Sequence, residues 1–267
     1  MSDPEIVEAL TRRAAELRRH VLTVAATGPA HVGGAMSAAD LMAALFFHWL
    51  RHDAPRDHFI MSKGHAVHVL HACLVERGLL DAEELKTCGQ TGSRLAGHPT
   101  RRAPGVEFAT GSLGHGLSVG MGMALAEQTR GSGARTVVLL GDGELQEGTV
   151  WETALAAPRF GLRNLLAIVD YNRFQACGPV DQLVPLDPLA DKWRAFRWNV
   201  LEIDGHDIAA ICAALDAVPA AQGPTAIVAR TIKGKGVPSV EGTTAAHYAV
   251  LGDDDIAAAL AALGGAA

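Results

Sequence analysis

Two polar side chains that follow apolar runs give the strongest chemical signal in this sequence. Asp142 lies in the segment GDGELQEG at residues 141–148, directly after the apolar run 136–140, and Asn172 ends the segment DYN after the run 165–169. Short β-branched and Leu-rich runs of this kind are typical of buried parallel strands, whose carboxyl ends bind ligands in open α/β sheets. A carboxylate and an amide oxygen at this edge would suit a hard divalent cation.

The residues beside Asp142 favour a diphosphate as the partner of that cation. Gly143 has no side chain, so a metal-bound diphosphate can approach the backbone closely. A helix beginning near Gln146 would point its positive end toward the anion. A Gly-Asp-Gly segment alone is also explained as a turn that caps a helix. Its pairing with a strand-terminal Asn is what favours a ligand site.

These two segments resemble the thiamin diphosphate and magnesium motif, and their wording resembles the transketolase family in particular. The resemblance extends over roughly residues 15 to 250. The other segments that carry it, in the family's order, are AHVGGAMS at 30–37, SKGHA at 62–66, GHP at 97–99, TGSLGHG at 110–116, WNVLEIDGHD at 198–207, KGKG at 233–236 and the single residue His247.

The resemblance implies roles for four histidines in loops that contain glycine or proline. His31 and His247 would contact the carbonyl and the adjacent hydroxyl of a ketose donor, and His98 would bind the terminal hydroxyl of its two-carbon unit. His65 would face the cofactor diphosphate, joined there by His247. Imidazole suits both tasks because it donates or accepts a proton near neutral pH. We expect only packing or surface roles for His48, His52, His58, His68, His71 and His206.

The resemblance also implies thiamin diphosphate as the cofactor and Mg²⁺, or Ca²⁺ or Mn²⁺ in its place, as the metal. The metal ligands would be Asp142, Asn172 and the backbone carbonyl of Phe174. The residues expected to contact the cofactor are His65, Gly111, Ser112, Leu113, Gly143, Asn172 and His247. Glu147 resembles a glutamate at the subunit contact that links paired active sites. The alternative for Glu147 is a solvent-facing acid in the first turn of a helix.

A second chain is expected to complete the site. In transketolases the glutamate that faces the aminopyrimidine ring, and the basic residues that grip the sugar phosphate, belong to the carboxyl-terminal half. We find no candidate for that glutamate in this sequence. We therefore expect a partner resembling that half, in an α2β2 assembly that acts on sugars or sugar phosphates. The helices expected near 116–130 and 146–157 would supply contact surface.

Three positions depart from the family's usual wording. His115 stands where glutamine is common, Cys177 precedes a glycine, and Tyr248 follows His247 in place of glycine. These changes point to a donor or acceptor other than the usual pentose phosphates.

Composition narrows the class of protein. The formal charge of -6 comes without blocks of like charge, which argues against a nucleic-acid surface. No apolar run approaches the roughly 18 residues of a membrane-spanning helix, and the first five residues are acidic rather than signal-like. The four cysteines show no metal-binding spacing and are expected to be reduced. We therefore expect a soluble, cytoplasmic protein.

Helical and strand patterns alternate along the chain. Helices are predicted from Pro4 to a stop at 27–29, from Ser37, over 64–77, from a cap at Asp81, and over 116–130, and Pro158 should shorten the helix after Glu147. Strands are predicted at 58–61, 136–140, 165–169, 200–203 and 225–229. This order, without a long linker or repeat, predicts an α/β fold with a three-layer, doubly wound and mostly parallel sheet, in one domain over 1–267.

Two other functions remain open at this point. One is a different thiamin enzyme, either an acyloin-forming synthase or a subunit that decarboxylates 2-oxoacids. The four loop histidines favour the transketolase interpretation, because decarboxylases have no sugar hydroxyl to deprotonate. The other is a non-catalytic scaffold subunit, which the loss of Asp142, Asn172 or His31 would have marked. All three residues are present.

Overall fold

A parallel sheet forms the centre of the molecule. The computed structural model describes residues 3–264, and its strands lie in the order β1-β2-β3-β5-β4 with every neighbouring pair parallel. Their bounds are β1 His58–Met61, β2 Thr136–Gly141, β3 Leu165–Tyr171, β4 Asn199–Asp204 and β5 Thr225–Arg230. Each strand lies where an apolar run predicted it, and the predicted α/β class is confirmed.

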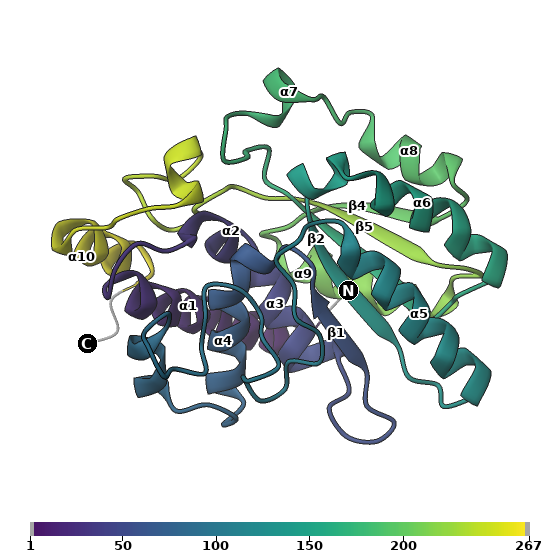
Figure 1. Ribbon diagram of the computed structural model, residues 1–267, viewed down its shortest axis with the longest axis horizontal. Helices are drawn as coiled ribbons and strands as arrows, with labels where there is room; N and C mark the ends of the chain where they lie inside the picture. Colours follow the sequence, from purple (N-terminus) through teal and green to yellow (C-terminus); the bar gives the residue numbers. More distant parts are fainter. Residues whose placement is uncertain (1–2, 265–267) are drawn as a thin grey trace.

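Helices cover both faces of this sheet, which gives three layers (Figure 1). The helices are α1 Pro4–Ala25, α2 Val32–Ser37, α3 Ala39–Ala44, α4 Val67–Glu76, α5 His115–Arg130, α6 Gly148–Ala156, α7 Val180–Leu183, α8 Leu189–Ala195, α9 Ile208–Ala217 and α10 Asp253–Ala262. Val137 and Leu139 of β2 pack with α1, α3, α4 and α9, whereas Val138 and Leu140 pack with α5, α6 and α8. Because both faces are buried, the strands are continuous apolar runs.

The predicted close packing of α5 is confirmed on the side that faces the sheet. Gly120 lies against β2, where an added Cβ would stand only 2.4 Å from Cγ2 of Val138. Gly116 lies equally close to Ser62, with an added Cβ 2.1 Å from its hydroxyl oxygen. Side chains at either position would push α5 away from the strands.

The prediction that Ser37 opens a helix is wrong. Ser37 is the last residue of α2, and its hydroxyl donates a hydrogen bond of 2.6 Å to the carboxylate of Asp170. The next helix, α3, begins at Ala39 and has no side-chain cap. The buried carboxylate therefore takes the hydroxyl that the sequence pattern assigned to a helix end.

The segment after Asp142 also differs from its prediction. Residues Gly143–Gln146 form a turn of 3₁₀ helix, and the α-helix begins only at Gly148. Its predicted end is confirmed, because α6 stops at Ala156 and a 3₁₀ turn containing Pro158 follows. The predicted helix over 64–77 likewise divides into a 3₁₀ turn, Gly64–Ala66, and α4.

The strand ends bring the predicted ligand residues to one edge of the sheet. Gly141 of β2 pairs with Asp170 of β3, so Asp142 and Asn172 follow the ends of adjacent strands. This is the edge at which open α/β sheets bind ligands. Over residues 3–264 no helix has both the length and the apolar character needed to cross a membrane.

Candidate functional site

A pocket of about 260 Å³ opens at the carboxyl ends of β2 and β3. Of the predicted site residues, all except Ser112 and Glu147 line it. Those that do are His31, His65, His98, Gly111, Leu113, Asp142, Gly143, Asn172, Phe174 and His247. Segments from both ends of the chain thus converge on one cavity.

The four predicted histidines form a single cluster around His31. The ring centroid of His31 lies 5.8 Å from that of His65, 5.8 Å from that of His98 and 5.5 Å from that of His247. His65 and His247 are 5.2 Å apart. An isolated bridge between Ala30 and Ala249 holds the first and last of these segments side by side.

These imidazoles favour the neutral form. Burial lowers the pKa of His31 and of His98, and it lowers the pKa of His65 well below its usual value. Burial, followed by the nearby charges of Lys233 and His31, lowers the pKa of His247 to about 4. A neutral imidazole nitrogen accepts a proton or a hydrogen bond, which is the state required of a general base.

Asp142 is a buried carboxylate that forms no ion pair with any residue in the range 3–264. It accepts hydrogen bonds from the backbone N–H groups of Gly143 and Arg173. Burial, and then the negative charge of Asp170, raise the pKa of Asp142 to about 6. A divalent cation at this position would reverse that shift, because it favours the ionised carboxylate.

The two other predicted metal ligands face the same pocket. The amide oxygen of Asn172 accepts the N–H of Phe174, at 3.2 Å, while its amide nitrogen donates to Asp170. The carbonyl oxygen of Phe174 accepts a 2.6 Å hydrogen bond from the ammonium group of Lys233. A positive charge therefore already contacts one of the three proposed ligand oxygens.

Two buried lysines were not predicted from the sequence. Lys63 forms an ion pair with Asp170 in which neither side chain is exposed. Burial alone would raise the pKa of Asp170, but Lys63, Ser37 and Thr231 lower it through charge and hydrogen bonds. Burial, and then repulsion from Lys63, lower the pKa of Lys233 to about 8. The segments SKGH and KGKG contain both lysines, and a lysine next to glycine in a ligand-edge loop is the signal that could have found them.

Glu144 is a third residue that the sequence did not single out. It is buried, and its carboxylate accepts hydrogen bonds from the hydroxyl of Ser62 and from the backbone N–H groups of Gly114 and Gly141. It thereby joins the end of β1, the glycine loop before α5 and the end of β2. Glu144 positions these segments and lines the pocket itself.

The glycine loop at 110–116 depends on its lack of side chains. Gly111 has φ +150°, and an added Cβ would stand 3.3 Å from the ring of His98. Gly114 has φ +86°, and an added Cβ would stand 2.6 Å from the hydroxyl of Thr149. Gly143 is approached from the other side by Gln175, 3.0 Å from an added Cβ.

Ser112 and Glu147 lie outside the pocket, and both are exposed. Glu147 is the residue before α6, and its side chain makes no capping hydrogen bond to that helix. His115, one of the three departures, is also exposed, at the first position of α5. Their surface positions would allow contact with another chain.

Tyr248 lies against the histidine cluster. Its ring centroid is 4.8 Å from that of His31, and 57% of the residue is exposed. An aromatic ring at this position covers one side of His31, where the usual glycine would leave it open.

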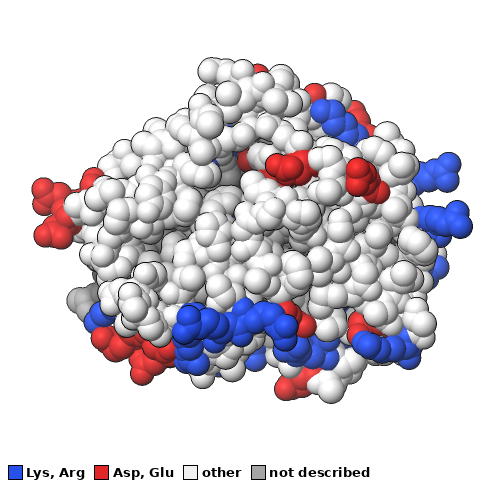
Figure 2. Space-filling view, in the orientation of Figure 1, with Lys and Arg blue, Asp and Glu red and all other residues white. Residues whose placement is uncertain are grey.

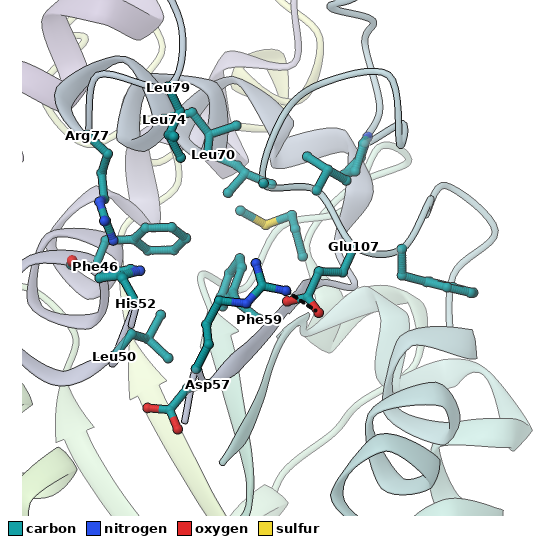
Figure 3. Close-up of a pocket in the computed structure, with 16 residues that line it drawn as sticks. Phe46, Leu50, His52, Asp57, Phe59, Leu70, Leu74, Arg77, Leu79 and Glu107 are labelled. Carbon is teal, nitrogen blue, oxygen red and sulfur yellow. Dashed lines mark hydrogen bonds and ion pairs between the residues drawn. The ribbon is translucent and has the colours of Figure 1, made fainter. Parts of the chain in front are cut away.

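A second cavity, of about 280 Å³, contains none of the predicted site residues. Figure 3 shows apolar side chains such as Phe46, Phe59 and Leu70 pointing into it, and Arg56 paired with Glu107 at its edge. Asp57, at its base, bonds to Arg51 and Arg135. Its acidic groups are thus already neutralised, and it lacks the histidine and oxygen cluster of the first pocket.

Comparisons with known proteins agree with the site. The model of the family "Transketolase, thiamine diphosphate binding domain" matches residues 11–266. One of the two separately named subunits of an apulose-4-phosphate transketolase, from Phocaeicola vulgatus, is 38% identical over 252 residues, covering 91% of this chain and 90% of that protein. A 6-deoxy-6-sulfo-D-fructose transketolase subunit of a Clostridium species is 41% identical over 244 residues, covering 88% and 89%.

A solved structure gives the same result for the fold. Transketolase from Campylobacter jejuni is similar with a TM-score of 0.90 and 30% identity, over 98% of this chain and 43% of that one. The chain thus spans about two-fifths of the length of that transketolase, but nearly the whole length of the proteins named as transketolase subunits.

Proposed function

This chain belongs to the transketolase family, and we propose that it is the cofactor-binding subunit of a two-chain enzyme that transfers a two-carbon ketol unit from a ketose to an aldose. One observation carries the proposal: His31, His65, His98 and His247 converge beside the oxygens of Asp142 and Asn172. Sugar chemistry requires several proton-accepting groups, whereas a decarboxylase does not.

The residues at the edge of the sheet fit Mg²⁺, with Ca²⁺ or Mn²⁺ as substitutes. Asp142 supplies a buried carboxylate whose raised pKa a cation would lower, and Asn172 supplies an amide oxygen. The carbonyl of Phe174 already accepts an ammonium group. Oxygen donors of these kinds are the ligands that hard divalent cations prefer.

The same pocket fits thiamin diphosphate, which supplies, when bound, the electron sink required to cleave a bond next to a carbonyl. Gly111, Leu113 and Gly143 would offer backbone contacts, together with Ser112 at the loop surface. His65 and His247 would face the diphosphate. The ammonium group of Lys233, 2.9 Å from Nδ1 of His247, would add positive charge toward it.

The other histidines would act on the ketose donor. His31 and His247 would hold the carbonyl and accept the proton of the adjacent hydroxyl, because their lowered pKa values keep them neutral. His98, at the glycine loop, would bind the terminal hydroxyl. These assignments are supported by the way the three rings surround one space.

A partner chain would supply the acid for the aminopyrimidine ring and would complete an α2β2 assembly. Figure 2 shows that the centre of one face is almost free of charged side chains, which gather at its rim. Apolar side chains are exposed on and near α6 and α7, including Leu155 at 68% and Val184 at 50%. Glu147 precedes α6 and would lie within such a contact.

The donor is proposed to be a sugar or sugar phosphate other than the common pentose phosphates. Relatives that match over nearly their whole length bear the names of an apulose phosphate and a sulfonated fructose. Tyr248 supports a changed donor, because its ring covers His31. We further propose that residues 1–267 form one domain, and that the protein is cytoplasmic, where its four free cysteines would stay reduced.

Reconstitution tests this function. The purified chain, with Mg²⁺ and thiamin diphosphate in excess, should show no ketol transfer. Addition of a partner resembling the carboxyl-terminal half of transketolase should restore activity, with saturation at equal molar amounts. Full activity of this chain by itself would disprove the two-chain proposal, and release of CO₂ from 2-oxoacids by the mixture would favour a decarboxylase.

A further inference from the structure

Two histidines and a cysteine meet at one end of α4, outside the groups to which the proposed ketol transfer assigns a role. His68 and His71 are one helical turn apart, and Cys88 directly follows the 3₁₀ helix Ala82–Thr87. One potential ligand atom from each of the three residues lies within 4.8 Å of the other two. Sγ of Cys88 is 3.9 Å from Nδ1 of His68.

His71 is the unusual member of this cluster. It has no exposed surface, and neither of its ring nitrogens has a hydrogen-bond partner within residues 3–264. Leaving a buried polar group without a partner costs on the order of 1–3 kcal/mol, so nearly all such groups in proteins are paired. A missing ligand explains both unpaired nitrogens better than an apolar role for imidazole.

The protonation of the cluster suits a metal rather than an anion. Burial lowers the pKa of His68 to about 4 and that of His71 to about 3, so both rings are neutral. Two neutral imidazoles and one thiol are nitrogen and sulfur donors, which zinc-like transition metals prefer to Mg²⁺. Zinc binds nitrogen at about 2.0 Å and sulfur at about 2.3 Å, so modest closure of the 4.8 Å spread suffices.

We propose that His68, His71 and Cys88 form a binding site for Zn²⁺ or a similar transition-metal ion. The site is separate from the proposed magnesium site, whose ligands are all oxygens. It supplies three protein ligands, and the fourth position opens toward a cavity of about 380 Å³ that His68 and Cys88 line. His31 and Tyr248 line the same cavity, so the bound ion lies beside the donor-binding cluster.

This arrangement separates the two metals by chemistry. A hard cation at Asp142 is held by carboxylate, amide and carbonyl oxygens, and it has no thiolate. Only the new site places sulfur on the metal. A signal that requires a metal–thiolate bond therefore reports on Cys88 and not on the cofactor site.

Metal uptake by the full chain tests the proposal. The chain is stripped with a chelator, loaded with Zn²⁺ and desalted, and zinc per chain is measured by elemental analysis, with affinity from competition against a chromophoric chelator. We expect about one tightly bound zinc. Cys88→Ser and His71→Phe should each weaken zinc binding by more than about 100-fold, since even residues that only orient ligands account for 10–100-fold. Cys177→Ser removes an exposed thiol and is the matched control.

Cobalt gives a second readout that does not depend on the variants folding. The wild-type chain loaded with Co²⁺ should show thiolate-to-cobalt charge-transfer absorption, and Cys177→Ser should retain it. Absence of both this absorption and tight zinc uptake in the folded wild-type chain would overturn the proposal. Equal loss in Cys88→Ser and Cys177→Ser would also overturn it, since that result would indicate unspecific binding by thiols.

Discussion

Lys233 donates a hydrogen bond of 2.6 Å to the carbonyl oxygen of Phe174, an oxygen proposed to bind the metal. An ammonium group and a divalent cation this close repel each other by about 1–4 kcal/mol in a partly hydrated pocket. Binding of the metal without the diphosphate is therefore opposed by Lys233, and binding of both together is favoured.

We expect Lys233→Met to bind Mn²⁺ several-fold more tightly than the wild-type chain when thiamin diphosphate is absent. The loss of free-ion electron paramagnetic resonance signal measures this binding. Lys235→Met is the matched control from the same loop, because Lys235 pairs with Glu241 instead. Weaker Mn²⁺ binding by Lys233→Met would contradict the proposed overlap.

Asp142→Ala should abolish binding of thiamin diphosphate with Mg²⁺ in the assembled enzyme, because it removes the one charged metal ligand. Calorimetry measures the affinity, and circular dichroism checks that the fold is intact. Asp191→Ala on α8 is the control, since Asp191 is exposed and pairs with Arg194 on the same helix. Unchanged cofactor affinity in Asp142→Ala would remove Asp142 from the metal site.

His31→Ala and His98→Ala should each lower ketol transfer by roughly 10²–10⁴-fold, as expected when a proton acceptor or donor-binding group is lost. Cofactor affinity should stay nearly normal, because neither residue is expected to touch the diphosphate. His48→Ala provides a control, since His48 lies near Asp216 and outside the pocket. Wild-type turnover in both His31→Ala and His98→Ala, with the true donor, would refute their assigned roles.

Asp57 predicts a pH dependence of stability. Burial alone would raise its pKa, but hydrogen bonds from Arg51 and Arg135 lower the pKa to about 2. The unfolded carboxyl titrates near 3.8. The folded pKa is the lower one, so the stabilisation is present above the unfolded value and is lost as the pH falls from about 4 toward 2.

The size of this effect is about 2 kcal/mol, because one pKa unit corresponds to about 1.4 kcal/mol. Urea unfolding at pH 5 and pH 3 should show a smaller loss of unfolding free energy in Asp57→Asn than in the wild-type chain. Asp254→Asn, at an exposed position in α10, should behave as the wild-type chain does. Identical losses for all three proteins would contradict the pKa assigned to Asp57.

The sheet and the oxygen donors of the pocket could be predicted from local sequence. Strands buried on both faces are continuous apolar runs, and polar residues that follow them, such as Asp142 and Asn172, must lie at the ligand edge. The histidines required the resemblance to a family, because nothing in a loop sequence says that His31 and His247 meet. The bridge between Ala30 and Ala249 that joins them links opposite ends of the chain.

The positions that escaped prediction share one physical cause. Ser37 fits a helix-capping pattern, and Lys63 stands two residues before His65 in a loop that carries no pattern of its own. Each is instead determined by Asp170, a buried carboxylate that no local pattern marks as a partner. Helix capping is local and readable, whereas the pairing of a buried charge depends on residues far away in the sequence.

The hydrogen bonds at Asp170 also constrain the order in which the protein can form its site. Its carboxylate is bound by Ser37, Lys63 and Thr231, which come from the beginning, the first quarter and the last part of the chain. Contacts between residues so far apart in sequence close slowly during folding. During synthesis, β2 and β3 leave the ribosome well before Thr231 does. Until then Asp170 lacks one of its partners, and the ligand edge of the sheet has to wait for almost the whole chain.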